Sequence, residues 1–130
     1  MLEGTVTRIP IFVSAILVVA PADAHDATVP RRLGTCVVTT ITDITGVYGN
    51  PHPGPEGAIV NYANRVAGVS FARALEIEHS AIGDPVRLCL VAMDRDCPRG
   101  DPRGRIYRAT NLRTKGSWKL GNSMHACDGA

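Results

Sequence analysis

Short runs of β-branched and apolar residues, separated by turns rich in glycine and proline, recur along the chain from residue 35 onward. Runs of this length and composition predict β-strands, whereas the segment 73–81 is rich in helix-forming residues and predicts one short helix. The run 86–93 is almost wholly apolar, which predicts the central and most buried strand. The predicted strands are residues 35–44, 58–62, 66–71, 86–93, 105–113 and 117–120.

The order of these elements defines a fold class. A helix between the third and fourth strands of a small closed sheet is the OB-like arrangement. We therefore expect a mainly β domain, a small five- to six-stranded barrel that is OB-like with one short helix, and an SH3-like barrel is the alternative. In the turn between the second and third strands, Asn64 is expected to take a positive φ.

The N-terminal segment has the layout of a secretory signal peptide. An apolar stretch, residues 9–20, is followed by Pro21 and by the small-residue site Ala22-Asp23-Ala24. This stretch is shorter than the roughly 20 residues that span a bilayer, so cleavage after Ala24 is expected, with an uncleaved anchor or a buried helix as the alternatives. The predicted organisation is a signal peptide (1–24), a mobile N-terminal arm (25–34) and a β-barrel domain (35–130), exported to the periplasm or the extracellular space without a transmembrane segment after cleavage.

Four cysteines lie in the predicted mature chain, and an even number in an exported protein predicts two disulfides. A zinc site is the competing interpretation, but it needs closely spaced cysteine pairs, and the nearest pair here is Cys89 and Cys97. The pairing Cys89–Cys97 with Cys36–Cys127 is favoured, because it closes one local loop and joins the two ends of the domain. The pairing Cys36–Cys89 with Cys97–Cys127 remains nearly equivalent.

The distribution of charge is uneven only in the C-terminal third of the chain. The whole chain has a formal net charge of +2, but residues 95–119 contain eight basic side chains against two acidic ones. Such a segment predicts either a basic face for an anionic partner or an ordinary solvated surface. The residues proposed from the sequence as a contact surface are Arg99, Arg103, Arg105, Arg108, Lys115 and Trp118.

The sequence contains no recognisable catalytic signature. A nucleophile with a nearby general base is missing, as are phosphate-binding loops and a carboxylate pair that faces one substrate. We therefore expect a protein that is not an enzyme and that uses no cofactor and no metal. One alternative is copper binding, because cleavage after Ala24 would make His25 the first residue, where its amino group and imidazole could chelate the metal. In this one feature the chain resembles small exported β proteins that bind copper.

Three segments of the last third of the chain, residues 83–91, 97–104 and 109–114, resemble small exported bacterial proteins that have no assigned activity. The resemblance implies export and disulfides, and it provides no catalytic or binding residue. In those relatives a glycine is expected directly after the threonine of the last hairpin, where this chain has Lys115.

The expected function is that of a non-enzymatic binding or interaction module. Its basic face would contact an unknown protein or an anionic envelope polymer. Nucleic acid is not the expected partner, because few aromatic residues are available for base stacking. Besides copper binding through His25, inhibition of an exported enzyme is the remaining alternative.

Overall fold

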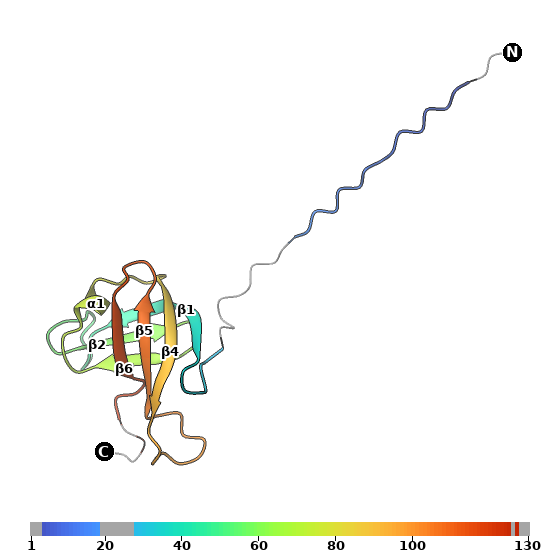
Figure 1. The fold of residues 1–130 in the computed structure, drawn as a ribbon. Helices are drawn as coiled ribbons and strands as arrows, with labels where there is room; N and C mark the ends of the chain where they lie inside the picture. The colour runs from blue at the N-terminus through green and yellow to red at the C-terminus, as the bar shows by residue number, and fades with distance from the viewer. Residues whose placement is uncertain (1–3, 19–27, 126, 128–130) are drawn as a thin grey trace.

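The computed structural model describes residues 4–18, 28–125 and 127, and its main feature is a closed six-stranded barrel with one short helix (Figure 1). The prediction of a mainly β barrel with one helix and two disulfides is confirmed. The elements in chain order are β1 (Cys36–Thr45), β2 (Ala58–Tyr62), β3 (Ala67–Ser70), α1 (Leu75–Glu78), β4 (Pro85–Met93), β5 (Arg105–Asn111) and β6 (Ser117–Gly121).

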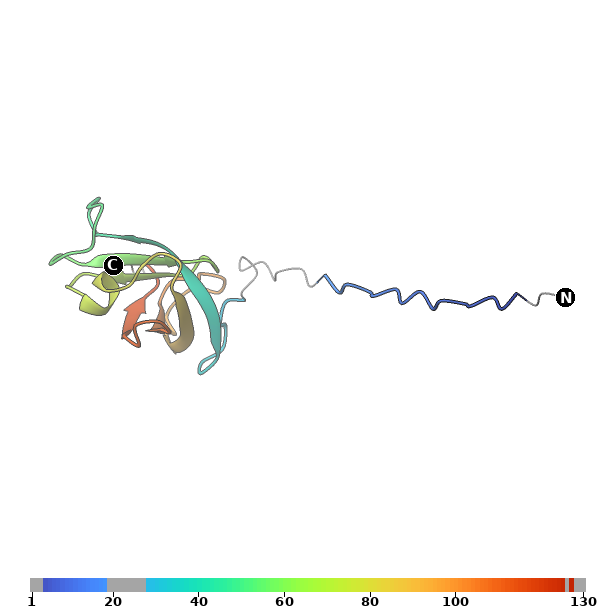
Figure 2. The same ribbon diagram turned by 90° about the horizontal axis from the view of Figure 1, so that it is seen from above.

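All neighbouring strands are antiparallel, and their order around the barrel is β1-β2-β3-β6-β5-β4. The long strand β1 pairs with β4 through its first half and with β2 through its second half. A register shift between Ile41 and Asp43 bends β1 from one partner to the other, as β-bulges commonly do. Figure 2 shows the barrel from above, with α1 at its side.

The core lies inside the barrel and is built from alternate residues of each strand. In β4, Val86, Leu88 and Leu90 are fully buried, whereas Arg87 between them and Val91 after them are exposed. The apolar run predicted the most buried strand, but only one face of β4 is in the core, because the outer face of a closed barrel meets solvent. Ile77 of α1 is also fully buried and joins the same core.

The helix is shorter than the predicted segment 73–81, since α1 covers only Leu75–Glu78. After α1, hydrogen bonds between Ala81 and Asp84 turn the chain toward β4: the Ala81 N–H donates to Asp84 Oδ2 at 2.8 Å, and the Asp84 N–H donates to the Ala81 carbonyl at 3.1 Å. These bonds compete with further helical turns. The helix propensity of the segment is therefore overridden by its connection to the barrel.

The turn between β2 and β3 differs from the prediction for Asn64. The residue with positive φ is Arg65, at 68°. Asn64 is instead buried, and its side-chain Oδ1 accepts a hydrogen bond from the Val66 N–H at 3.2 Å. This bond between a side chain and the backbone two residues on is a local alternative to a left-handed conformation at the asparagine itself. Arg65, and not Asn64, therefore takes the left-handed conformation.

The favoured disulfide pairing was wrong, and the alternative pairing is formed. Cys36 and Cys89 lie directly opposite each other on β1 and β4, with their Cα atoms 4.0 Å apart. Cys97 pairs with Cys127, with a Cα–Cα distance of 5.3 Å. The local pairing of Cys89 with Cys97 fails because four strand residues, at about 3.3 Å each, carry the chain away from Cys89 before the loop begins. Two disulfides are typical of proteins that mature in an oxidising, exported environment.

A buried polar network holds the end of the barrel next to α1. The Asp84 carboxylate accepts hydrogen bonds from Arg113 Nε at 2.6 Å and from Asn111 Nδ2 at 2.8 Å. Asn111 is fully buried, its Nδ2 also donates to Ser80 Oγ, and its Oδ1 accepts the N–H groups of Arg113 and Thr114. The network therefore joins the segment before β4 to the β5–β6 hairpin.

Two N-terminal segments lie outside the strands. In residues 6–18, eight large apolar side chains are each more than 80% exposed (Val6, Ile9, Ile11, Phe12, Val13, Ile16, Leu17 and Val18). Within the predicted arm 25–34, the structure describes residues 28–34: Val29 packs against the core, Pro30 is buried, and the Gly34 N–H donates to the Leu90 carbonyl. The part of the chain that the structure describes contains no helix with the length and apolar composition needed to cross a membrane. The cleavage site after Ala24 lies outside the described residues.

Lys115, in the β5–β6 hairpin, has a φ of 66° and offers a test of turn strain. A left-handed conformation costs a non-glycine residue about 1–2 kcal/mol, and glycine also gains entropy in the unfolded chain. Lys115→Gly is therefore expected to raise the free energy of unfolding by about 0.5 kcal/mol in urea denaturation. Lys115→Ala is the control, because it removes the same bond from Nζ to the Leu112 carbonyl without relieving φ. Equal stability of the two variants would contradict the strain argument.

Candidate functional site

The site lies at the end of the barrel opposite α1, where the loop 94–104 returns to the body (Figure 1). The Asp94 N–H donates to the Gly104 carbonyl at 2.8 Å and closes the base of this loop. Gly104 has a φ of 77°, and a Cβ there would lie 2.7 Å from Cys97 Sγ. Only glycine fits this position without moving the disulfide. The Cys97–Cys127 disulfide then joins the loop to the segment that follows β6.

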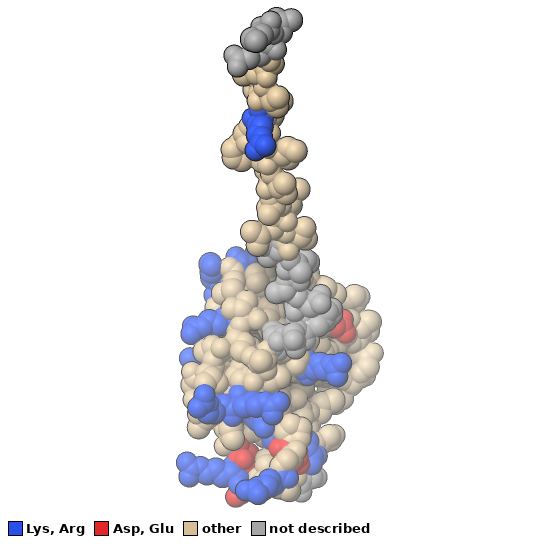
Figure 3. Space-filling model, turned by 90° about the vertical axis from the view of Figure 1, so that its right-hand side faces the viewer, with Lys and Arg blue, Asp and Glu red and all other residues tan. Residues whose placement is uncertain are grey.

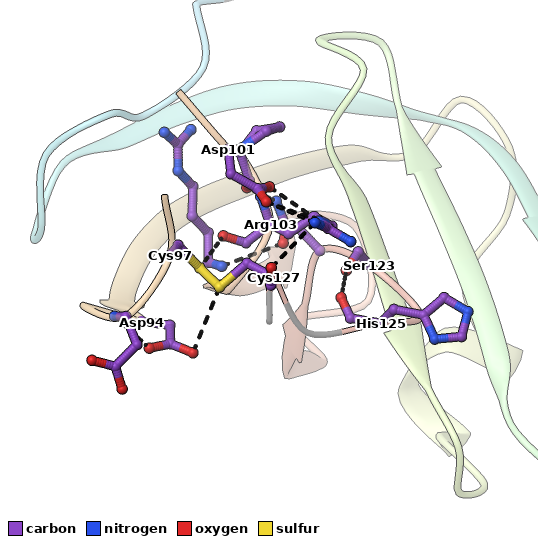
Figure 4. Close-up of a disulfide and its surroundings, with 11 residues drawn as sticks. Asp94, Cys97, Asp101, Arg103, Ser123, His125 and Cys127 are labelled. Carbon is purple, nitrogen blue, oxygen red and sulfur yellow. Dashed lines mark hydrogen bonds and ion pairs between the residues drawn. A yellow bond between two sulfur atoms is a disulfide. The ribbon is translucent and has the colours of Figure 1, made fainter. Parts of the chain in front are cut away.

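An ion pair fixes the C-terminal part of the loop. Arg103 Nη2 donates to Asp101 Oδ2 at 2.7 Å, and Arg103 Nε donates to Asp101 Oδ1 at 3.0 Å. The hydrogen bonds from Arg103 lower the pKa of Asp101 from its usual value to about 2. Arg103 Nη2 also donates to the Cys127 carbonyl at 3.3 Å, so this side chain connects the loop to the tail (Figure 4).

Behind this loop is a cavity of about 590 Å³. Its walls come from four parts of the chain. The first two are residues 29–31 and the β2–β3 hairpin. The third is residues 100–105, which end the loop and begin β5, and the fourth is the residue that follows β6. Four arginines line it, namely Arg31, Arg65, Arg103 and Arg105. We call this cavity, together with the four arginine side chains that line it, the arginine cavity.

The electrostatics of the arginine cavity are one-sided. Arg103 is paired with Asp101, but within residues 4–18, 28–125 and 127 no ion pair involves Arg31, Arg65 or Arg105. Asn64 also lines the cavity; it is 6% exposed, and its buried Nδ2 has no hydrogen-bond partner among the described residues. A buried amide donor without an acceptor costs about 1–3 kcal/mol. The cavity thus presents an excess of cations, which is the complement of an anionic ligand.

The structure separates the six residues proposed from the sequence. Only Arg103 and Arg105 line the cavity. Arg108 lies on the outer wall of the barrel, and Arg99 is exposed in the loop 94–104. Lys115 lies in the β5–β6 hairpin at the other end of the barrel, where its Nζ donates to the Leu112 carbonyl at 2.8 Å.

Trp118 belongs to the core and not to an exposed contact surface. Its side chain is 7% exposed, and its indole Nε1 donates to the Tyr62 hydroxyl at 2.9 Å. Burial raises the pKa of Tyr62, so its hydroxyl stays protonated over the whole working range of the protein. Tyr107 is also buried, at 3% exposure.

Sequence reasoning missed three cavity residues, Arg31, Asn64 and Arg65. Arg31 was assigned to the arm and Arg65 to an ordinary turn. A weak signal was present for Arg31, because Val29 and Pro30 before it interrupt a polar segment and now pack on the barrel. For Asn64 and Arg65 no signal existed, since their approach to the loop 94–104 depends on barrel closure.

No described cluster is free to hold a metal ion. Asp94, Cys97 and Cys127 place possible ligand atoms within 4.8 Å of one another, but both sulfurs are bonded in the disulfide. One carboxylate remains, which is too few ligands for a transition-metal site. His25, the residue of the copper alternative, lies outside the described residues.

Comparison with known proteins found no matching family model, no matching curated protein and no matching solved structure. A barrel fold by itself does not define an activity. The function must therefore be inferred from the chemistry of the site.

Proposed function

We propose that this chain is an exported, non-enzymatic binding module of the bacterial envelope or exterior, and that it holds an anionic group of its partner in the arginine cavity. The observation that carries this proposal is the excess of cations there: four arginines line the cavity, against one neighbouring carboxylate that is already ion-paired. Export is supported by the two disulfides and by the exposed apolar segment near the N-terminus, which fits a cleavable leader.

Guanidinium groups suit this role. Each presents a planar set of donors that binds carboxylate or phosphate oxygens in pairs, and it remains charged at every physiological pH. The volume of about 590 Å³ lies within the range of about 300–1,000 Å³ that is usual for small-ligand pockets.

The lining also favours binding over catalysis. Its described residues include no histidine, aspartate, glutamate, serine, cysteine or lysine. Besides the arginines, the one ionisable residue type in this described lining is a tyrosine, Tyr107, which is buried at 3% exposure. General acid–base catalysis needs a group that exchanges a proton near the working pH. The arginine cavity supports recognition of charge without such a group.

The test is a calorimetric titration of the protein with sodium tripolyphosphate and, separately, with trigalacturonate. We expect one site per chain, and an affinity that falls as salt rises, because added ions screen the charges. Arg65→Asn with Arg105→Ser should weaken binding at least tenfold, since each hydrogen bond to a charged group contributes about 1.5–3 kcal/mol. Asparagine is chosen at position 65 because it tolerates the positive φ.

The matched control is Arg95→Ser with Arg99→Ser. It removes two positive charges from exposed positions of the same loop that do not line the cavity. If both double variants lose the same affinity, net charge alone governs binding. Lack of binding of either probe by the unaltered protein at low salt would contradict the proposal.

A further inference from the structure

We infer that the partner is a linear polyanion, which reaches from the arginine cavity to a second basic cluster on the outer wall of the barrel. This inference rests on the proposed function, because it extends the same binding site. The second cluster consists of Arg87 on β4, Arg108 on β5 and Lys119 on β6, and we call it the wall cluster. All three side chains are exposed.

Strand register brings the wall cluster together. Arg108 and Lys119 are direct partners on β5 and β6. Arg108 is also the partner of Cys89 on β4, and Arg87 lies two residues before that cysteine. Diagonal neighbours of this kind are about 7–8 Å apart, within reach of long side chains. Three cations therefore project from adjacent strands onto one patch of the outer wall.

The wall cluster is electrostatically unfavourable in the free protein. Like charges directly opposite each other in a sheet are destabilising, and Arg108 faces Lys119 across the strands. Among the described residues none of the three forms an ion pair. The nearest outward positions, Thr110 and Ser117, are uncharged and offer no compensation. A bound anion would remove this repulsion.

Protection of a sheet edge does not explain the charges on β4 and β5. Lysine and arginine are often placed on edge strands to prevent pairing with other chains. Here β5 lies between β4 and β6 in a closed barrel, so it has a hydrogen-bonded neighbour on each side. Figure 3 shows that basic side chains predominate on the face turned to the viewer, and that acidic ones gather mainly at its lower end. The charges therefore suit a ligand surface better than an edge device.

The distance between the two clusters favours an extended ligand. Arg105 of the arginine cavity and Arg108 of the wall cluster are three residues apart on β5, which corresponds to about 10 Å along the strand. Arg105 lines the cavity at the barrel end, whereas Arg108 points outward from the wall. Because alternation places these two side chains on opposite faces of β5, a single phosphate or carboxylate group would not contact both. A chain with regularly spaced anionic groups can.

The aromatic residues do not favour single-stranded nucleic acid. Proteins that bind it stack bases on exposed aromatic rings beside a basic groove. Tyr107 and Trp118 lie on β5 and β6 but are buried. The exposed rings of Tyr48 and Phe71 lie outside β4, β5 and β6 and contact each other, with centroids 6.2 Å apart. The wall cluster thus offers charge without stacking.

The experiment compares long and short chains of the same chemistry. The full chain is titrated with long-chain polyphosphate and with tripolyphosphate, and in a second arm with polygalacturonate and trigalacturonate. The triple variant Arg87→Ser, Arg108→Ser and Lys119→Ser should bind the long chain at least tenfold more weakly and the short chain within twofold of the unaltered protein. The arm with the tighter long-chain complex identifies phosphate or carboxylate as the natural group.

A second triple variant, Arg32→Ser, Arg95→Ser and Arg99→Ser, controls for net charge, because it removes three exposed cations outside both clusters. It should retain long-chain binding within threefold, and circular dichroism should show both variants folded. If the wall variant and the unaltered protein bind the long chain with equal affinity, the polyanion inference is overturned, while the proposal for the arginine cavity still stands. If the unaltered protein does not bind the short chains, the proposed function itself is overturned. A single-stranded oligonucleotide that binds more tightly than either polymer would also overturn the inference.

Discussion

Replacement of both Cys36 and Cys89 by alanine is expected to lower the free energy of unfolding by about 4 kcal/mol. The disulfide joins residues 53 positions apart, and in the chain-entropy treatment a cross-link of that span removes about this much conformational freedom from the unfolded chain. It also joins β1 to β4 directly, at a position where the two strands are already paired. The measurement is urea denaturation of the oxidised protein and of the double variant at pH 7.

The double variant Cys97→Ala and Cys127→Ala is the matched comparison. Its disulfide spans 30 positions, so a slightly smaller loss of stability is expected. Its effect on anion binding should be larger, because this disulfide holds the loop that contributes Arg103 to the arginine cavity. If the Cys36–Cys89 variant unfolds at the same urea concentration as the unaltered protein, the cross-link adds no stability, and the entropic argument fails.

Substitution of Asp84 by asparagine is expected to cost about 3 kcal/mol at pH 7. The carboxylate is 7% exposed and accepts hydrogen bonds from Arg113, Asn111 and the Ala81 N–H. An amide at this position loses the charge that strengthens these bonds, and it presents an NH₂ group to other donors. Hydrogen bonds to a buried charge contribute about 1.5–3 kcal/mol each, and partial loss of several gives the expected total.

The pH dependence of this cost tests its origin. Hydrogen bonds from Arg113, and then from Asn111, hold the pKa of Asp84 well below its usual value of 3.8. A lowered pKa in the folded state means that ionised Asp84 stabilises the fold fully above about pH 4 and that this contribution is lost as the pH falls toward the folded pKa. The difference in unfolding free energy between the unaltered protein and Asp84→Asn should therefore shrink between pH 5 and pH 2.

Asp101→Asn is the control for this experiment. Its ion pair with Arg103 is accessible to solvent on the arginine side, where 42% of the side chain is exposed. Exposed ion pairs contribute little, so this variant should cost much less than Asp84→Asn at pH 7. Its small cost should also shrink as the pH falls, because the pKa of Asp101 is lowered as well. A pH-independent cost of Asp84→Asn would point to steric misfit rather than to lost charge.

The strands were predictable because each is a local property of the chain. Runs such as 58–62 and 105–113 contain β-branched and apolar residues between turn signals, and β2 and β5 form there. The helix was overestimated because its propensity competes with the bonds between Ala81 and Asp84, which depend on the following strand. Local composition thus located the elements but not their ends.

The candidate site was predictable only in part, because it is assembled from distant segments. The basic segment 95–119 contains Arg103 and Arg105, which line the cavity, but strand alternation places Arg108 outside and Trp118 inside. Arg65 enters the cavity from a hairpin 40 positions earlier in the chain than Arg105. The disulfide pairing was mispredicted for the same reason, since Cys36 and Cys89 meet only when β1 and β4 close the barrel.

Under the proposed function, the Cys97–Cys127 bond would make the timing of ligand capture depend on the compartment. In a reducing cytoplasm the thiols of a newly made chain stay apart, so the loop 94–104 is not tied to the segment after β6, and the walls that supply Arg103 and Asn122 are not fixed. A chain awaiting transport would thus have an incomplete cavity and would not sequester the nucleotides and other phosphorylated metabolites around it. Affinity for anions would be gained only after oxidation, at the place where the partner resides.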